Sequence, residues 1–166
     1  MALASVLAAL GGFWLVGLRV NLSASIPIGL YRERSADARA FARGRIVLVC
    51  LPSFVARFAR GRGYLPRGRC HNGAMAAGKV ITAVSGDTVR VGEDGISVNG
   101  SLLSASVPLL RDRSGRALPR LARGTYLVPT GALWLGSRSR FGFDSRYFGA
   151  VPVSAVRATI DPVWTP

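Results

Sequence analysis

Lys79 is the residue whose type stands out most in this sequence. It is the single Lys among 22 basic residues, and the other 21 are Arg. An arginine keeps its proton in proteins because its pKa lies above about 12, whereas a lysine among apolar groups can lose it. Lys79 directly precedes Val80 and Ile81 at the start of an apolar run. It is therefore a candidate general base, with an ordinary surface charge as the alternative.

A lysine base calls for a hydroxyl nucleophile, and Ser25 is the best placed of many serines. It lies in the run SASIPIGLY, after an uncharged N-terminal segment, where Pro27 and Gly29 imply an irregular but defined backbone. The alternative is a simple linker between a membrane segment and a domain. Ser25 and Lys79 together predict a Ser/Lys dyad, in which a neutral amine takes the hydroxyl proton before attack on a carbonyl.

Other chemistries have less support. The only histidine, His71, lies in the loop sequence RGRCHNG and is better explained as a loop residue than as a member of a catalytic triad. One His and two Cys do not supply a four-ligand zinc site, and there is no P-loop or GxGxxG. No metal or cofactor is expected. Cys50 and Cys70 form either a disulfide, if the domain is exported, or two buried thiols.

Residues 1–18 contain no charged side chain and would span about 27 Å as a helix, close to the thickness of a bilayer core. We expect a retained transmembrane anchor. A cleaved signal peptide is the alternative, since Ser23-Ala24-Ser25 could act as a cleavage site, and a buried core helix is a third. The anchor is favoured because Ser25 is needed for the chemistry. Arg19 opposes the positive-inside rule for an exported domain, but one charge is weak evidence.

The rest of the chain, residues 19–166, predicts one mainly antiparallel β domain. Short β-rich runs alternate with glycines, and helical turns are expected at 35–43 and 53–60. Residues 101–123 are rich in Ser, Arg and Pro and are expected to be an insertion outside the core. The expected strands are 45–51, 80–84, 88–91, 95–98, 125–129, 132–136 and 153–160.

The charge and hydropathy of the chain exclude some classes of protein. The 166 residues carry a formal net charge of +14, yet 49% are hydrophobic, which excludes a charged disordered tail. The charge could attract acidic phospholipid or nucleic acid. It is better explained by the Arg-, Ala- and Gly-rich composition, so no direct nucleic-acid partner is expected.

Four segments resemble the signal peptidase superfamily of Ser/Lys serine proteases, specifically its conjugative-transfer branch of the TraF type. They are NLSASIPIGLYR (21–32), ARGRIVLVCLP (42–52), AGKVITAVSGDTVRV with GISVNG (77–100), and GTYLVPTGALWLGSRSRFGFDSRYFGAVP (124–152). They occur in the family's order and cover most of the chain outside 1–18 and 101–123. The resemblance implies a signal-peptidase-like antiparallel β domain behind an N-terminal transmembrane helix.

The resemblance also implies roles for individual residues. Ser25 would be the nucleophile and Lys79 the general base. Ser23 and the backbone N–H of Ser25 would form the oxyanion hole, worth roughly 3 kcal/mol per donor. Asp144 and Arg146 would be a supporting ion pair, with Asp144 of possible further importance for activity in the conjugative branch.

Three positions depart from the family's pattern. Val80 follows the lysine where the family usually has Arg, and the usual G-D-N triplet is Gly136-Ser137-Arg138. Gly142 stands where a Ser of related enzymes would hydrogen-bond the lysine, so Ser139 or Ser145 would have to replace it. These departures concern the orientation of Lys79.

The expected function is that of a membrane-anchored serine endopeptidase that removes a peptide from an exported precursor, most of all a conjugative pilin, with cyclisation as an option. A general type I signal peptidase is one alternative, and a non-catalytic basic β domain in a secretion or conjugation complex is another. The expected location is the bacterial inner membrane, single-pass, with the catalytic domain in the periplasm. The expected partners are the precursor, inner-membrane lipid and other conjugation or type IV secretion components.

Overall fold

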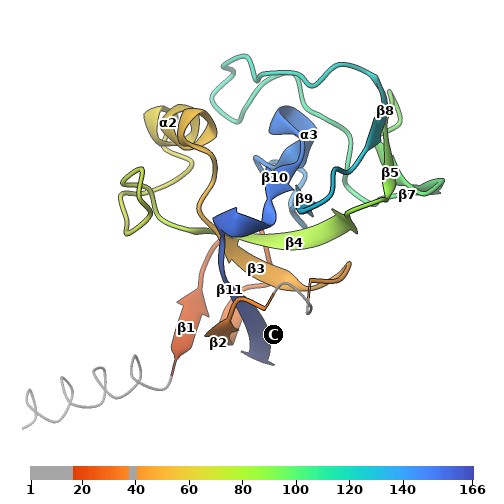
Figure 1. The fold of residues 1–166 in the computed structure, drawn as a ribbon. Helices are drawn as coiled ribbons and strands as arrows, with labels where there is room; N and C mark the ends of the chain where they lie inside the picture. The colour runs from red at the N-terminus through yellow and green to blue at the C-terminus, as the bar shows by residue number, and fades with distance from the viewer. Residues whose placement is uncertain (1–16, 38–40) are drawn as a thin grey trace, which may run out of the picture.

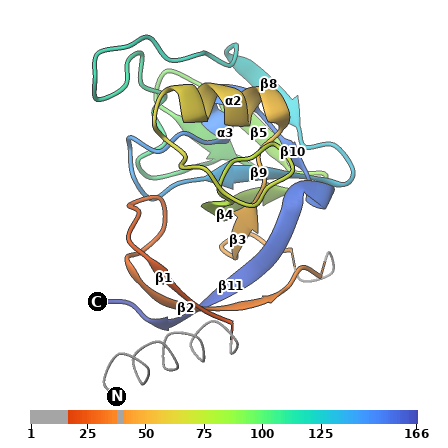
Figure 2. The same ribbon diagram turned by 90° about the vertical axis from the view of Figure 1, so that its left-hand side faces the viewer.

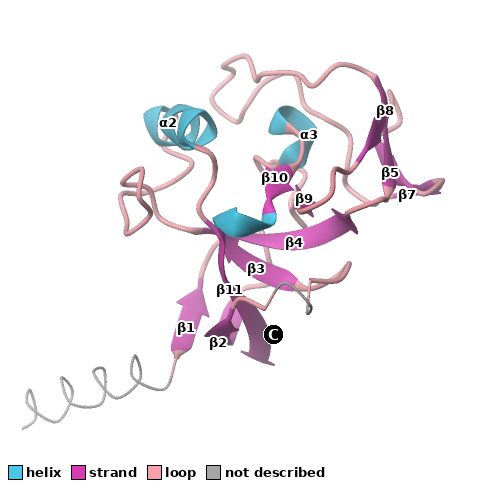
Figure 3. Ribbon diagram, viewed as in Figure 1, coloured by secondary structure: helices cyan, strands magenta, loops and turns pink. Residues whose placement is uncertain are grey.

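Two antiparallel sheets make up most of the computed structural model, which describes residues 17–37 and 41–166 (Figure 1). The larger sheet has seven strands in the order β1 (Leu18–Asn21), β2 (Gly29–Ser35), β11 (Val156–Trp164), β3 (Ile46–Val49), β4 (Ala77–Val84), β9 (Ala132–Gly136) and β10 (Val151–Pro152). The smaller has four, in the order β7 (Ser101–Leu102), β6 (Ile96–Val98), β5 (Thr88–Val91) and β8 (Gly124–Leu127). The helices are α2 (Ser53–Gly61), α3 (Ser145–Phe148) and the 3-10 turn η2 (Val153–Ala155), and strands and loops dominate (Figure 3). The mainly antiparallel β class expected from the sequence is confirmed.

Strand β4 crosses the centre of the fold and places Lys79 inside it. Alternate residues of β4 are buried, as the period of two in a strand requires. Ile81 of β4 packs with Val47 of β3, Leu135 of β9 and Val55 of α2 in the main hydrophobic cluster. Lys79 has the same parity in β4 as Ile81, so the strand carries the lysine to the buried face.

Strands β1 and β2 form a hairpin at the edge of the large sheet, and β11 pairs along β2 (Figure 2). The loop of this hairpin, residues 22–28, carries Ser25, and Asn21 pairs with Gly29 across its base. Gly29 has φ 155°, and a Cβ there would lie 2.2 Å from the backbone oxygen of Trp164 in β11. Only glycine therefore fits where the loop that carries Ser25 meets the last strand.

Most of the expected strands are confirmed, but some boundaries are not. Residues 153–155 form the turn η2, and the last strand begins at Val156 and runs to Trp164. The turn expected at 53–60 is α2. The turn expected at 35–43 is wrong in its described part, because β2 extends to Ser35 and 41–43 are not helical; residues 38–40 lie outside the described residues.

The predicted anchor falls almost entirely outside the described residues, which begin at Gly17. Leu18 is already the first residue of β1, so the strand starts inside the segment 1–18. In the described part of the chain, no helix has the length and apolar character that a membrane crossing needs.

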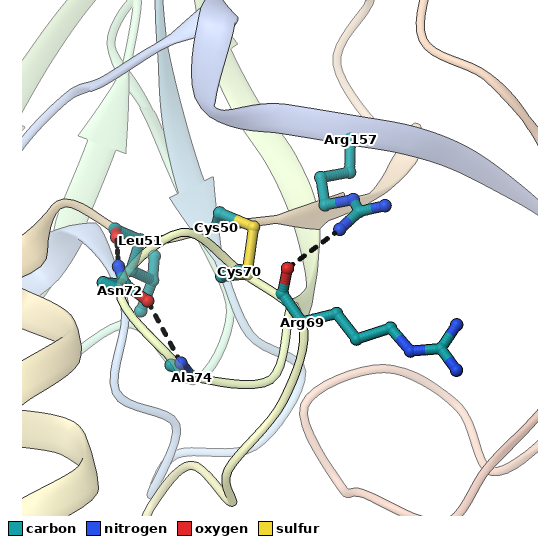
Figure 4. The surroundings of a disulfide bond; sticks show 7 residues. All are labelled: Cys50, Leu51, Arg69, Cys70, Asn72, Ala74 and Arg157. Carbon is teal, nitrogen blue, oxygen red and sulfur yellow. Dashed lines mark hydrogen bonds between the residues drawn. A yellow bond between two sulfur atoms is a disulfide. The ribbon is translucent and has the colours of Figure 1, made fainter.

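Cys50 and Cys70 form a disulfide, which decides between the two alternatives left open by the sequence (Figure 4). The bond ties the end of β3 to the loop between α2 and β4. In the same loop Asn72 donates to the carbonyl of Leu51 at 2.7 Å. Closing a loop of 20 residues contributes about 3 kcal/mol by restricting the unfolded chain. Gly68, Arg69 and Cys70 of this loop line the same groove as Lys79.

Candidate active site

Ser25 and Lys79 lie together in the structure, although 54 residues separate them in the sequence. The Nζ of Lys79 is 3.4 Å from the Oγ of Ser25, a long hydrogen bond that has to shorten to about 3.2 Å or less for proton transfer. Ser25 comes from the β1–β2 loop and Lys79 from β4. Gly78 allows this approach, because a Cβ at that position would be 3.0 Å from Ile26 in the same loop as Ser25.

Burial dominates the electrostatics of Lys79. Only 4% of the residue is exposed, and this burial lowers the pKa of the amine from 10.5. The negative charge of Asp144 raises the pKa in the opposite direction, and the positive charge of Arg146 lowers it. The net effect lowers the pKa of Lys79, so at a given pH a larger fraction of its amine is neutral, as a general base requires, than in a free lysine.

Asn21 organises the loop that carries Ser25. Its amide donates to the carbonyls of Ser23 and Pro27, both at 2.9 Å, and its Oδ1 accepts the Ser23 hydroxyl at 2.8 Å and the Ser23 N–H at 3.2 Å. The buried Tyr31 donates to Pro27 from β2 at 2.7 Å. The sequence reasoning missed Asn21. The signal available was an Asn two residues before a Ser, a pattern typical of local side-chain-to-backbone turns.

Ser23 lies at the rim of the groove that contains Ser25, but its hydroxyl donates to Asn21. The structure therefore brings Ser23 near Ser25 without directing its proton into the groove. To act in an oxyanion hole, the Ser23 hydroxyl has to exchange its Asn21 partner for the oxyanion.

Residues after β9 hold Ser25 from the other side. The N–H of Arg138 donates to the carbonyl of Ser25 at 2.9 Å, and the Ser137 hydroxyl donates to the same oxygen at 3.3 Å. A Cβ on Gly142 would lie 2.2 Å from the Ser137 side chain. Ser137 therefore occupies the space that a serine at 142 would need. Its role was not predicted from the sequence.

Ser139 and Ser145 do not replace that missing serine in this structure. The Oγ of Ser145 accepts the N–H of Leu135 at 2.9 Å, and the Oγ of Ser139 accepts the N–H of Phe141 at 3.2 Å. Among the described residues, the recorded side-chain hydrogen bond of Lys79 is the one to Ser25.

Asp144 and Arg146 form a buried, two-pronged ion pair. Arg146 donates from Nε and Nη2 to the two carboxylate oxygens at 2.7 and 2.8 Å. Arg146 is 4% exposed and Asp144 is 0% exposed. Burial alone would lower the pKa of Arg146, but the bonds and charge of Asp144 outweigh it and raise that pKa. The guanidinium also donates to four backbone carbonyls, those of Ala105, Ser139, Arg140 and Gly142. The pair thus fixes the segment behind Lys79.

A groove of about 1150 Å³ opens over Ser25 and Lys79. One of its walls is the start of β4. There, residues 77–79 pair with β3 on one side, whereas β9 pairs with β4 only from Val80 onward. Among residues 17–37 and 41–166, no strand pairs with the other edge of 77–79, so an extended peptide can add to it. His71 lines neither this groove nor the cavity beside it, and the described ranges hold no cluster of three metal-ligating side chains.

The fold and the paired Ser25 and Lys79 agree with the family comparison. The family model "Signal peptidase, peptidase S26" matches residues 1–165, and the chain belongs to this peptidase family.

More specific similarity is to plasmid transfer proteins. The chain is 40% identical over 164 residues to the plasmid transfer protein TraF of Escherichia coli, covering 98% of this chain and 90% of that protein. It is 38% identical over 153 residues to the probable conjugal transfer protein TraF of Sinorhizobium fredii, covering 92% and 79%. A signal peptidase I from Enterococcus faecalis of known structure is 20% identical, with a TM-score of 0.42 over 73% of this chain and 97% of the other.

Proposed function

We propose that the protein is a membrane-anchored endopeptidase with Ser25 as nucleophile and Lys79 as general base. The observation that carries the proposal is the buried Lys79 amine at 3.4 Å from the Ser25 hydroxyl. A surface lysine would remain charged at neutral pH and could not accept a proton. Membership of the signal peptidase family supports a peptidase activity.

The reaction follows from the positions of these groups. Neutral Lys79 accepts the Ser25 proton as Oγ bonds to the substrate carbonyl carbon, and the carbonyl oxygen becomes an oxyanion. The Ser25 N–H and the Ser23 hydroxyl stabilise that oxyanion. The C–N bond then breaks and Lys79 returns the proton to the leaving amine. Water, deprotonated by Lys79, attacks the acyl-enzyme, and the acid product and the Ser25 hydroxyl are released.

The substrate binds as an extended strand along residues 77–79 of β4. Main-chain hydrogen bonds to this free edge supply affinity that does not depend on sequence. Ser25 lies beside Lys79, at one end of this three-residue stretch of β4. The Ile26 side chain packs against Gly78, so the groove leaves little room for a substrate side chain next to Ser25. Small residues beside the scissile bond suit this space.

Exposed apolar side chains support the placement of the catalytic domain at a membrane surface. Leu22 in the nucleophile loop is 79% exposed, Val20 in β1 61% and Trp164 in β11 62%. The pairing of β1 with β2 and of β2 with β11 brings their strands side by side. Arg19 in the same strand as Val20 forms an ion pair with Glu33, which reduces its weight as a topology signal.

The compartment we propose is the periplasmic side of the bacterial inner membrane, with residues 1–18 as a single-pass anchor. The Cys50–Cys70 disulfide supports an oxidising compartment. A domain in the periplasm would meet exported precursors as they leave the membrane.

The substrate class we propose is a conjugative pilin precursor, and the partners are inner-membrane lipid and other conjugation components. The names of the relatives, plasmid and conjugal transfer proteins, support this choice over a general signal peptidase. If the substrate's own N-terminal amine attacks the acyl-enzyme in place of water, the product is a cyclic pilin. This reaction forms a new peptide bond and consumes no water, whereas hydrolysis consumes one molecule.

Processing of a pilin precursor by purified full-length variants tests the function. Ser25→Ala and Lys79→Arg should both abolish cleavage, since Arg keeps the charge of Lys79 but cannot accept a proton. Ser101→Ala, on the exposed strand β7, is the matched control and should cleave normally. Retained cleavage in Ser25→Ala or Lys79→Arg would contradict the dyad, and a non-catalytic basic domain would then be the better explanation.

A further inference from the structure

A second cavity, of about 360 Å³, meets the groove at Ser25. Ser25, Tyr64 and Phe141 line both spaces. One wall of the second cavity comes from the segment 101–123, including Arg113 and Arg116, and Arg62 and Tyr147 contribute to the rest. This segment arches over α3 toward α2 as the long teal loop between β7 and β8 (Figure 1). The segment expected to be an insertion outside the core therefore lies beside the nucleophile.

Asp112 holds this wall in place. Its carboxylate accepts the Tyr64 hydroxyl at 2.5 Å, the Nε of Arg116 at 2.7 Å and the Nη1 of Arg62 at 3.4 Å. Oδ1 also accepts the backbone N–H groups of Ser114 and Arg116, both at 2.9 Å. Burial alone would raise the pKa of Asp112, but these bonds keep that pKa well below its usual range. The carboxylate is thus fully used within the wall.

The cavity has a surplus of positive charge. Arg62, Arg113 and Arg116 line it together with one acidic residue, Asp112, which leaves two formal positive charges. Asp112 pairs with Arg62 and Arg116. Arg113 has no acidic partner recorded among the described residues, and its guanidinium stacks over the Phe141 ring at 4.3 Å from the centroid. The ring therefore holds a cation at the cavity beside Ser25 without neutralising it.

A peptide substrate bound at Ser25 extends away from it in two directions, one on each side of the scissile bond. The groove with the free edge of β4 accommodates the part before the scissile bond, which becomes the acyl group. The second cavity also opens at Ser25, so it is available to the part after the scissile bond.

We propose that this cavity is the subsite for the leaving segment of the substrate, that it selects an acidic side chain there, and that Arg113 is the residue that selects it. The inference rests on the proposed peptidase function. It adds a specificity that the dyad and the free edge of β4 do not provide, because both act on the main chain.

Cleavage of matched peptides tests the assignment. The peptides differ only in carrying Glu, Gln or Lys at each of the first four positions after the scissile bond, and a second set carries the same changes before it. At the preferred position, wild type should cleave the Glu peptide about fivefold faster in kcat/KM than the Gln peptide, the effect of one exposed ion pair. Arg113→Gln should remove this ratio, and Arg113→Glu should favour Lys. Arg120→Gln, an exposed arginine of the same segment that does not line the cavity, should keep the wild-type ratio.

Three results would overturn the proposal: no Glu preference after the bond in wild type, a preference that survives Arg113→Gln, or a preference dependent on Arg113 that lies before the bond. Failure of the peptidase function has a different signature, namely no cleavage of even the Gln peptides. A binding measurement separates the two. The free leaving peptide with Glu should bind Ser25→Ala about fivefold more tightly than its Gln form, and equal binding would refute the subsite whether or not cleavage occurs.

Discussion

Replacing Asp144 with Asn should destabilise the fold far more than a single hydrogen bond would suggest. In the native protein the Asp144 carboxylate receives two bonds from the Arg146 guanidinium and lies in a fully buried position. The Asn amide keeps the size and one acceptor oxygen, but it loses the charge and replaces the second acceptor with an NH2 donor, so the buried guanidinium loses its counter-charge and one of its two side-chain bonds. Removing one partner of a buried pair costs about 3–5 kcal/mol. For a domain of this size that corresponds to about 9–15 °C in Tm.

Chemical denaturation of the full-length chain in mild detergent measures this loss. The matched control is Asp94→Asn, which breaks the exposed i,i+4 pair with Arg90, where each side chain is 53% exposed. That change should cost less than about 1 kcal/mol because solvent screens the pair. The reasoning is refuted if Asp144→Asn unfolds within 1 kcal/mol of the Asp94→Asn control at unchanged m-value.

Three further predictions concern the site. The kcat/KM of wild type should rise with pH as Lys79 loses its proton, with a midpoint below the 10.5 of a free lysine because burial lowers this pKa; a rate that is flat or falls from mild acid to mild alkali would contradict it. Asn21→Ala should lower kcat by about 10- to 100-fold with little change in Tm, because a displacement of about 1 Å in the loop that carries Ser25 reduces the rate by up to that factor. An unchanged kcat would show that the loop keeps its conformation without Asn21. Gly29→Ala should cost about 1–3 kcal/mol in chemical denaturation because its Cβ would meet a backbone oxygen at 2.2 Å, and a stability equal to wild type would disprove this steric account.

The sequence predicted the central strands well and the edge hairpin poorly. Strands such as β3 and β9 are short apolar runs that closely follow a glycine, and this pattern is visible in the sequence alone. Strands β1 and β2 have exposed or partly exposed residues at most positions, and β2 joins the sheet through β11, more than 120 residues later. A strand stabilised by such a distant partner leaves little local pattern.

The site shows the same division. Lys79 was found because it is the exception in an arginine-rich chain, and its burial follows from the alternation of β4. Asn21 and Ser137 were missed because they act through hydrogen bonds to the backbone of a loop whose shape cannot be read from residue types. The cavity wall formed by 101–123 was missed for a similar reason: its composition is typical of an exposed loop.

The attachment of that wall has a consequence for how the protein can evolve. Arg146 binds the backbone oxygen of Ala105, and the Tyr147 hydroxyl accepts the backbone N–H of Leu109. Neither contact depends on which side chains the segment carries. Between these points and β8, substitutions at positions other than Asp112 and Arg116, whose side chains tie the segment to Tyr64 and Arg62, can therefore accumulate while the segment stays docked on the core. Under the function proposed above, specificity for a new substrate can be gained by altering this one stretch, with no change to Ser25 or Lys79.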